Sequence, residues 1–200
     1  MGSHKSRKHK AYRRKSGRNK KLLLATGFVA VVIVIVAVYY MFGQPNPSQD
    51  KVLLETTRGD IVIELRNDMP ITTGNFKKLV QQGTYDGSIF HRVISDFMIQ
   101  GGDPTGTGFG DPSIPAIQDE FTSSNRNDRG AIAMANSGPN TGSSQFFINV
   151  VDNNYLDSKH PVFGRVTEGM DVVDAISEVA TDSGDSPLQE VRIIKAAFAN

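Results

Sequence analysis

The chain has 200 residues, which is enough for one ordinary domain and a short additional segment. It contains no cysteine, and this excludes disulfide bonds and cysteine-based metal sites. The net charge of +1 hides an asymmetry, because residues 1–21 hold ten of the 22 Lys and Arg and no acid, whereas the rest of the chain holds twelve against all 21 Asp and Glu, a net charge of −9.

An uncharged and mostly apolar stretch follows this basic arm at residues 22–42. As an α-helix it would extend about 31 Å, close to the ~30 Å hydrocarbon core of a bilayer. Tyr39 and Tyr40 stand at its far end, where aromatic side chains favour the membrane interface. The stretch predicts one transmembrane helix. A cleaved signal peptide is the alternative, but the stretch is longer than the usual ~7–15 apolar residues and no small-x-small cleavage motif follows it.

The basic residues of the arm all lie on the N-terminal side of this predicted span: Lys5, Arg7, Lys8, Lys10, Arg13, Arg14, Lys15, Arg18, Lys20 and Lys21. Positive charge keeps the adjoining end of a span in the cytoplasm. We therefore expect a single-pass membrane protein with a cytoplasmic N-terminus and an extracytoplasmic body. Binding of nucleic acid or anionic lipid by the arm is an alternative role, but setting topology accounts for its charge more simply, and we expect no nucleic-acid partner.

Residues 43–50 contain two prolines and are predicted to be a linker to a domain of residues 51–200. Two strands, 52–57 and 61–66, are expected around a turn at residues 58–60. The turn spells Arg-Gly-Asp, and a tight hairpin explains this triplet more simply than an adhesion motif does.

A helix is expected to begin near Asp68 and Pro70 and to end at Gly83. Later patterns predict a second helix at 170–179 and strands at 89–94, 97–100, 131–135, 146–151, 161–166 and 191–198. Many short strands with Gly- and Asn-rich turns and two helices are typical of a β-sandwich or β-barrel.

Several common catalytic sites find no support in the body of the chain. Its histidines are His91 and His160, without an HExxH motif, so we predict no metal and no cofactor. The Gly-rich run 106–110 leads into Asp-Pro-Ser and not into a helix start with Lys-Ser/Thr, so it lacks the context of a nucleotide loop. A Ser–His–Asp triad is compatible with the composition, but no serine lies in a Gly-x-Ser-x-Gly turn.

Five motifs instead carry a specific pattern of polar and apolar residues. They are FHRVI at 90–94, FMIQGGD at 97–103, MANSGPNT at 134–141, SQFFI at 144–148 and LDSKHPVFG at 156–164. Taken singly, such residues are compatible with an ordinary core stripe and a solvated charge. Their order closely resembles that of the cyclophilins across roughly residues 51–198.

The resemblance implies a mainly β fold, a closed eight-stranded antiparallel β-barrel capped by two α-helices, with side chains filling its interior. It also implies a groove on the outer wall that binds X-Pro segments, and peptidyl-prolyl cis–trans isomerase activity. The partners expected are proline-containing peptides and unfolded proteins, and the expected role is to assist the folding of extracytoplasmic proteins. The alternative is a non-catalytic, chaperone-like module that only holds proline-containing peptides.

Residue roles follow from the same resemblance. Arg92 is expected to donate a hydrogen bond to the prolyl nitrogen in the transition state, with Gln100 holding Arg92 and the peptide backbone. The residues that match the proline pocket are Phe97, Met98, Phe147 and Leu156, and those that match the flanking groove are Ala135, Asn136, Gln145 and His160. His91 is a weaker candidate, because neighbouring strand residues point to opposite faces.

Tyr155 departs from the family pattern, since this position is often Trp in cyclophilins and is associated with strong binding of cyclosporin. Tyr keeps an aromatic wall but loses the indole area and its N–H. We therefore expect retained catalysis and weak cyclosporin binding. The short connection from Gly102 to Glu120 resembles that of the compact microbial members.

Overall fold

The computed structural model describes residues 49–199, which belong to one compact unit, Asn46–Asn200. The predicted basic arm at 1–21, the predicted span at 22–42 and nearly all of the predicted linker lie outside the described residues, so these remain predictions. Within residues 49–199, no helix has the length and apolar character needed to cross a membrane.

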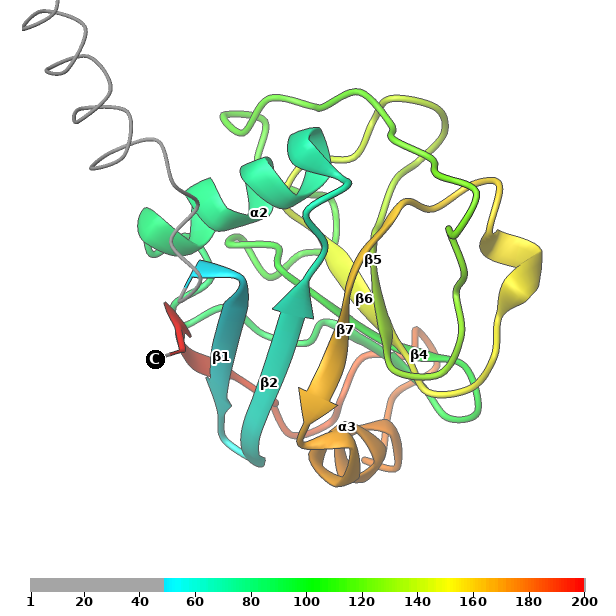
Figure 1. Cartoon of the computed structure of the whole chain (residues 1–200). Coiled ribbons are helices and arrows are strands. Elements are labelled where there is room, and N and C mark those ends of the chain that lie inside the picture. The colour runs from blue at the N-terminus through cyan, green and yellow to red at the C-terminus, as the bar shows by residue number, and fades with distance from the viewer. Residues whose placement is uncertain (1–48, 200) are drawn as a thin grey trace, which may run out of the picture. The chain divides into compact units, whose positions relative to one another are not determined.

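One antiparallel sheet of eight strands forms the described part of the chain (Figure 1), and its strands are β1 (Lys51–Thr56), β2 (Gly59–Leu65), β3 (Arg92–Ile94), β4 (Met98–Gly101), β5 (Ala131–Met134), β6 (Phe146–Asn149), β7 (Val162–Glu168) and β8 (Ile193–Phe198). The spatial order is β3-β4-β6-β5-β7-β2-β1-β8. Two α-helices, α2 (Pro70–Gln81) and α3 (Met170–Ser177), lie near opposite ends of the strands. A short 3₁₀ helix, η2 (Asn154–Leu156), was not predicted.

The prediction of a closed barrel is wrong, because the sheet is a half-barrel whose end strands β3 and β8 do not pair. The segment predicted as one strand, 89–94, is a ladder strand only at Arg92–Ile94, and Ile89 makes isolated bridges to Asp103 on one side and Arg192 on the other. Phe90 N–H donates to Val191 O at 2.9 Å, and the regular ladder with β4 begins at Arg92. The outer edge of β3 is covered by a loop, since Val93 N–H donates to Asp185 O at 2.8 Å.

The first hairpin also differs from the prediction. Its turn consists of Thr57 and Arg58, and Gly59 already pairs with Thr56 in the ladder. Gly59 has φ +128°, and a Cβ there would lie 2.8 Å from Val172 Cγ2, so the position requires glycine. Most of the Arg-Gly-Asp triplet is therefore strand.

Side chains fill the inside of the curved sheet, as expected. Strand alternation buries Val52 and Leu54 of β1, and Phe76 of α2 packs against aromatic rings beneath it. The Phe76 ring centroid lies 5.0 Å from that of Phe163 and 5.6 Å from that of Phe146. A second, smaller cluster forms on the outer face from Met98, Ala131, Ala133, Phe147 and Val162. The adjacent β6 residues Phe146 and Phe147 therefore project from opposite faces of the sheet, Phe146 into the core and Phe147 into the outer cluster.

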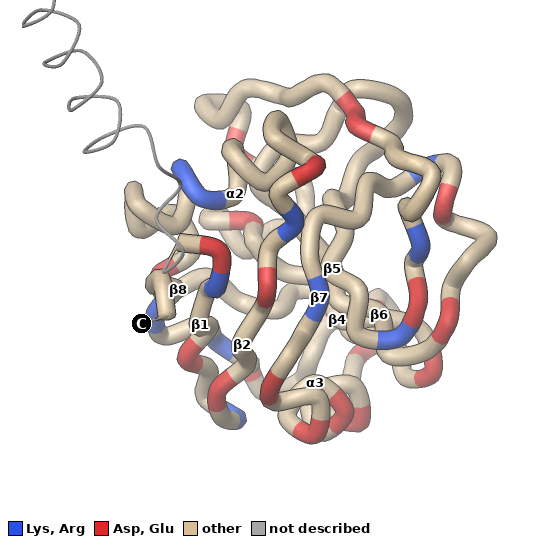
Figure 2. The backbone as a smooth tube through the Cα atoms, viewed as in Figure 1, with Lys and Arg blue, Asp and Glu red and all other residues tan. Residues whose placement is uncertain are grey.

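The acidic character of the body is spread over its surface. Figure 2 shows Asp and Glu on the β1–β2 hairpin, on α3 and in the loops, with fewer Lys and Arg between them. Seven ion pairs are formed among the described residues, and several of them involve side chains more than two-fifths exposed. Exposed pairs of this kind contribute only about 0–1 kcal/mol each, so the core and not the surface charge stabilises the fold.

Candidate functional site

The outer face of β3, β4 and β6 brings an arginine next to an apolar pocket. Arg92 lies opposite Gln100 in the β3–β4 ladder, and Gln100 lies opposite Phe147 in the β4–β6 ladder. Residues directly opposite one another on paired strands project from the same face. Met98 is two positions from Gln100 and therefore shares this face, as does Ala133, which lies opposite Phe147.

The pocket itself is the small outer cluster. Met98 and Phe147 are only 2% and 4% exposed, and Phe97 and Leu156 pack against them. The structure thus brings together the four residues expected to hold a proline ring. All four are apolar, and because Met98 and Phe147 are almost fully covered, the apolar surface open to a ligand comes mainly from the partly exposed Phe97 and Leu156.

Two aromatic residues form the rim of the pocket. Tyr155 is 66% exposed, and its ring stacks on Phe97 with the centroids 6.4 Å apart. The His160 ring meets Phe147 edge-on at 5.2 Å. His160 Nδ1 lies 3.1 Å from Met134 O, and because a carbonyl oxygen only accepts, Nδ1 carries the hydrogen and Nε2 is an acceptor in the neutral ring.

The polar side chains of the groove are fixed by a chain of hydrogen bonds. Gln100 Nε2 donates to Gln145 Oε1 at 2.8 Å, and Gln145 Nε2 donates to Gly108 O at 3.0 Å. Arg92 Nε donates to Asp185 Oδ2 at 3.3 Å. Among the described residues Gln100 therefore holds Gln145, and the expected hydrogen bond between Gln100 and Arg92 is not formed.

Ala135 and Asn136 lie just beyond the end of β5. The Ala135 N–H donates to Gln145 O at 3.0 Å, and Asn136 Nδ2 donates to Lys159 O at 2.8 Å. Asn136 and His160 also border a hollow of about 400 Å³ that reaches Phe121. The hollow adjoins the apolar pocket at His160, whose ring also meets Phe147.

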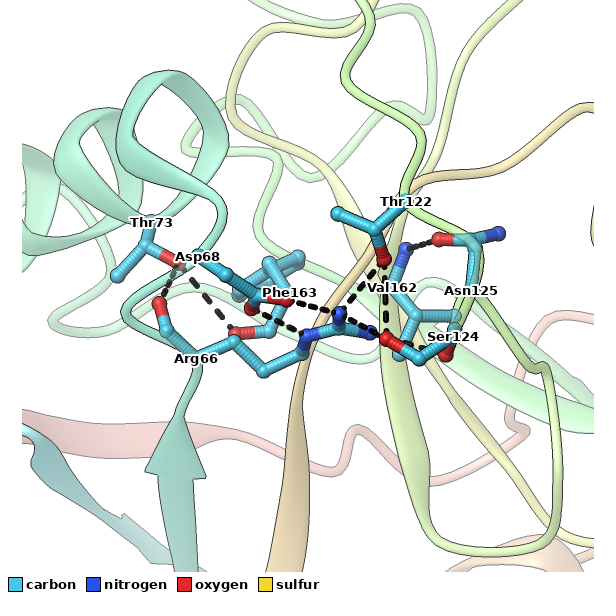
Figure 3. Close-up of polar contacts among 8 residues, drawn as sticks. All are labelled: Arg66, Asp68, Thr73, Thr122, Ser124, Asn125, Val162 and Phe163. Atoms are coloured by element: carbon cyan, nitrogen blue, oxygen red, sulfur yellow. Dashed lines mark hydrogen bonds and ion pairs between the residues drawn. The ribbon is translucent and has the colours of Figure 1, made fainter.

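An arginine remote from the groove fixes the loop that supports the pocket rim (Figure 3). Arg66 Nη2 donates to Thr122 Oγ1 at 2.8 Å and to Ser124 Oγ at 2.7 Å. Arg66 Nε donates to Asp68 Oδ1 at 2.9 Å. The neighbouring Asn125 then accepts the Val162 N–H at 2.7 Å through Oδ1.

Asn125 also binds the segment that carries the rim. Its Nδ2 donates to Asp157 O at 2.6 Å and to His160 O at 3.1 Å. Sequence reasoning missed Arg66 and Asn125, because their partners lie far away in the chain and neither belongs to one of the five motifs.

The Gly-rich run 106–110 packs beside the groove around a buried carboxylate. Asp103 accepts the N–H groups of Thr105, Gly108 and Gly110 at 2.9, 2.7 and 3.1 Å. Burial opposes ionisation of Asp103, but the hydrogen bonds outweigh it and hold the pKa below its ordinary value of 3.8. This run is thus a structural turn that presents Gly108 O to Gln145.

His91 lies beneath this turn, beside Gln145. A Cβ on Gly108 would lie 3.2 Å from the His91 ring, and both ring nitrogens are buried without a hydrogen-bond partner among the described residues. Burial lowers the pKa of His91, although the Asp103 carboxylate opposes this effect. His91 is therefore a neutral packing residue at pH 7.

The arrangement favours binding and hydrogen bonding. A permanently charged donor, Arg92, stands beside the apolar cluster. Within residues 49–199, no three His, Cys, Asp or Glu side chains are grouped so that they could hold a metal ion.

Residues 51–198 match the family model described as "Cyclophilin type peptidyl-prolyl cis-trans isomerase/CLD". The chain is 50% identical over 147 residues to peptidyl-prolyl cis-trans isomerase ppi1 of Schizosaccharomyces pombe, covering 72% of this chain and 95% of that protein. It is 48% identical over 154 residues to human peptidyl-prolyl cis-trans isomerase-like 1, covering 72% and 90%. A crystal structure of a Cryptosporidium parvum cyclophilin type peptidyl-prolyl cis-trans isomerase in the presence of the dipeptide Ala-Pro superposes with a TM-score of 0.72 at 33% identity, covering 75% and 99%.

Proposed function

Because the chain belongs to the cyclophilin family and is a peptidyl-prolyl cis–trans isomerase of that type, we propose that Arg92 and the adjoining apolar pocket catalyse the rotation. Rotation about an X–Pro amide is opposed by a barrier of ~18–20 kcal/mol and takes tens to hundreds of seconds unaided. An acceleration of ~10⁵ requires about 7 kcal/mol of selective transition-state stabilisation. No bond is made or broken, so the site needs no nucleophile.

Arg92 supplies the selective interaction in this proposal. At the twisted transition state the prolyl nitrogen loses its resonance with the carbonyl and becomes a basic acceptor, which the planar ground state does not offer. Within residues 49–199, the Arg92 guanidinium donates through Nε to Asp185, and both terminal NH₂ groups remain available to a substrate. A donor already oriented beside an apolar surface is worth more than the same donor in water.

The remaining groove residues hold the substrate while it rotates. Phe97, Met98, Phe147 and Leu156 anchor the proline ring, and Gln100 binds the peptide backbone. Ala135, Asn136, Gln145 and His160 receive the flanking residues. Tyr155 closes one side of the pocket, and its lack of an indole supports the proposal that cyclosporin binds only weakly.

The observation that carries this mechanism is the ladder register that sets Arg92, Gln100 and Phe147 side by side on one face. We expect Arg92→Ala to lower kcat/KM for an X-Pro peptide by about 10²–10³-fold, as loss of one oriented donor does at other sites. Arg165→Ala is the matched control, because Arg165 is an exposed arginine on β7, ion-paired with Glu64 at 2.9 Å and outside the groove. An unchanged rate in Arg92→Ala would refute the assignment.

For the cellular role, we propose that residues 22–42 anchor the isomerase in a membrane, with residues 51–200 outside the cytoplasm, where it assists unfolded proteins. The length of the apolar stretch and the basic residues before it support this proposal. Protease added to intact cells should digest the domain and leave the arm protected. Digestion of the arm with the domain left protected would contradict the orientation.

A further inference from the structure

Asp185 lies in the loop between α3 and β8 and is held there by its backbone. Its φ of +64° is in the left-handed region, which few residues other than glycine, asparagine and aspartate adopt. Its N–H donates to Asp182 O at 3.2 Å, and its carbonyl accepts the Val93 N–H at 2.8 Å. The loop is braced further by Asp182 Oδ1, which accepts the Gly184 and Ser186 N–H groups at 2.8 and 3.0 Å.

The side chain of Asp185 is directed at the arginine of the groove. Asp185 Oδ2 accepts Arg92 Nε at 3.3 Å, and the two side chains are 42% and 43% exposed. A guanidinium is planar and rigid, so a bond that fixes the direction of Nε also fixes where the two terminal NH₂ groups point. Gln100 donates its side-chain hydrogen bond to Gln145 and not to Arg92. Among the described residues, Asp185 is therefore the side chain that forms a hydrogen bond with this guanidinium.

We propose that Asp185 is a positioning residue, which orients Arg92 toward the prolyl nitrogen without touching the substrate. The inference rests on the role proposed above for Arg92. An ion pair this exposed contributes little to the free energy of unfolding. The pair acts instead by restricting the rotamers of the Arg92 side chain before the transition state is reached. A donor that is already oriented loses less entropy when it forms its hydrogen bond.

The test compares Asp185→Asn and Asp185→Gly in the full-length chain, because both replacements tolerate a positive φ and preserve the loop. We expect kcat/KM to fall by about two- to fivefold, the range that an exposed ion pair can supply, with the loss mainly in kcat and Tm almost unchanged. Asp174→Asn is the matched control. Asp174 pairs with Arg129 at 2.7 Å with side-chain exposures of 43% and 45%, and its replacement should leave kcat/KM unaltered.

A double-mutant cycle then separates positioning from a general structural effect. In an Arg92→Ala background, with residual rates measured by NMR exchange at high enzyme concentration, Asp185→Asn should cause no further loss. In the parent chain kcat/KM should fall as salt is added, because salt screens the pair, and this dependence should be weaker in Asp185→Asn.

Three results would overturn the inference in distinguishable ways. An equal loss from Asp185→Asn in both backgrounds would make Asp185 merely structural. If kcat/KM is unchanged in Asp185→Asn but falls strongly in Arg92→Ala, Asp185 does not position Arg92, and the proposed function stands. No loss from Arg92→Ala would refute the proposed function and this inference with it.

Discussion

Tyr155 combines wide exposure with a fixed orientation, since its ring stacks on Phe97 at the edge of the pocket. Tyr155→Trp adds apolar area and an N–H donor at the same place. We expect it to increase cyclosporin affinity by about tenfold, equivalent to about 1.4 kcal/mol, while kcat/KM stays within about twofold. Titration calorimetry and a peptide assay measure the two quantities.

Tyr155→Phe is the control for this prediction, because it removes only the hydroxyl group. It should change cyclosporin affinity far less than the Trp replacement does. An equal affinity in the parent chain and Tyr155→Trp would show that the indole does not limit inhibitor binding here.

Residues inside the five motifs could be placed from the sequence, because strand alternation and motif order together assign them to one face. Phe97, Met98, Phe147 and Leu156 indeed meet in one cluster. Asp185 could not be foreseen in the same way, since its partner Arg92 lies 93 positions earlier in the chain. No local pattern marks an aspartate in a loop as the neighbour of a distant arginine.

At the scale of the element, the run that follows β4 depends on a single carboxylate. Asp103 is fully buried and receives three backbone N–H groups, together with the Thr105 hydroxyl at 2.8 Å. In Asp103→Asn an NH₂ group would face some of these donors. We expect the free energy of unfolding to fall by about 2–3 kcal/mol, measured by urea denaturation.

Asp111→Asn is the control, because Asp111 is partly exposed and accepts a single backbone N–H, from Ser113 at 2.8 Å. Its replacement should cost well under 1 kcal/mol, about the value typical of a surface change. Equal losses in the two variants would show that burial of Asp103 does not govern the stability of the run.

The same carboxylate gives stability a pH dependence of known sign. The pKa of Asp103 is lower in the folded chain than in the unfolded one, so its contribution is complete above the unfolded pKa of about 3.9 and is lost as pH falls through the folded pKa. Unfolding measured below about pH 4 should therefore be less pH-dependent in Asp103→Asn than in the parent chain.

Most elements could be predicted because their patterns are local. The helix expected to start at Asp68 and Pro70 is α2, and the strand expected at 191–198 is β8, which begins at Ile193 and ends at Phe198. The strand expected at 89–94 was too long, because the ladder is interrupted at residues 90 and 91, where Phe90 N–H donates to Val191 O instead. Such an interruption depends on tertiary contacts and leaves no periodic signal.

For the whole molecule, the closure of the sheet was the feature that could not be predicted. Whether eight strands close depends on the two end strands, and here the loop around Asp185 occupies the free edge of β3. The charge of a segment, in contrast, is simply the sum of the charges of its residues and does not depend on the fold. The excess of Asp and Glu over Lys and Arg along the tube in Figure 2 could therefore be anticipated from composition alone.

The pairing of β1 with β8 also limits when the sheet can be completed during folding. Val52 pairs with Phe198, so the first and last strands of the domain are neighbours. The β1–β2 hairpin can form within ~1–10 μs, whereas the β1–β8 contact closes a loop of nearly the whole domain. Sheets dominated by such distant contacts fold in about milliseconds to seconds. During synthesis, one edge of β1 therefore stays exposed until β8 emerges from the ribosome, and the arrival of β8 completes the core.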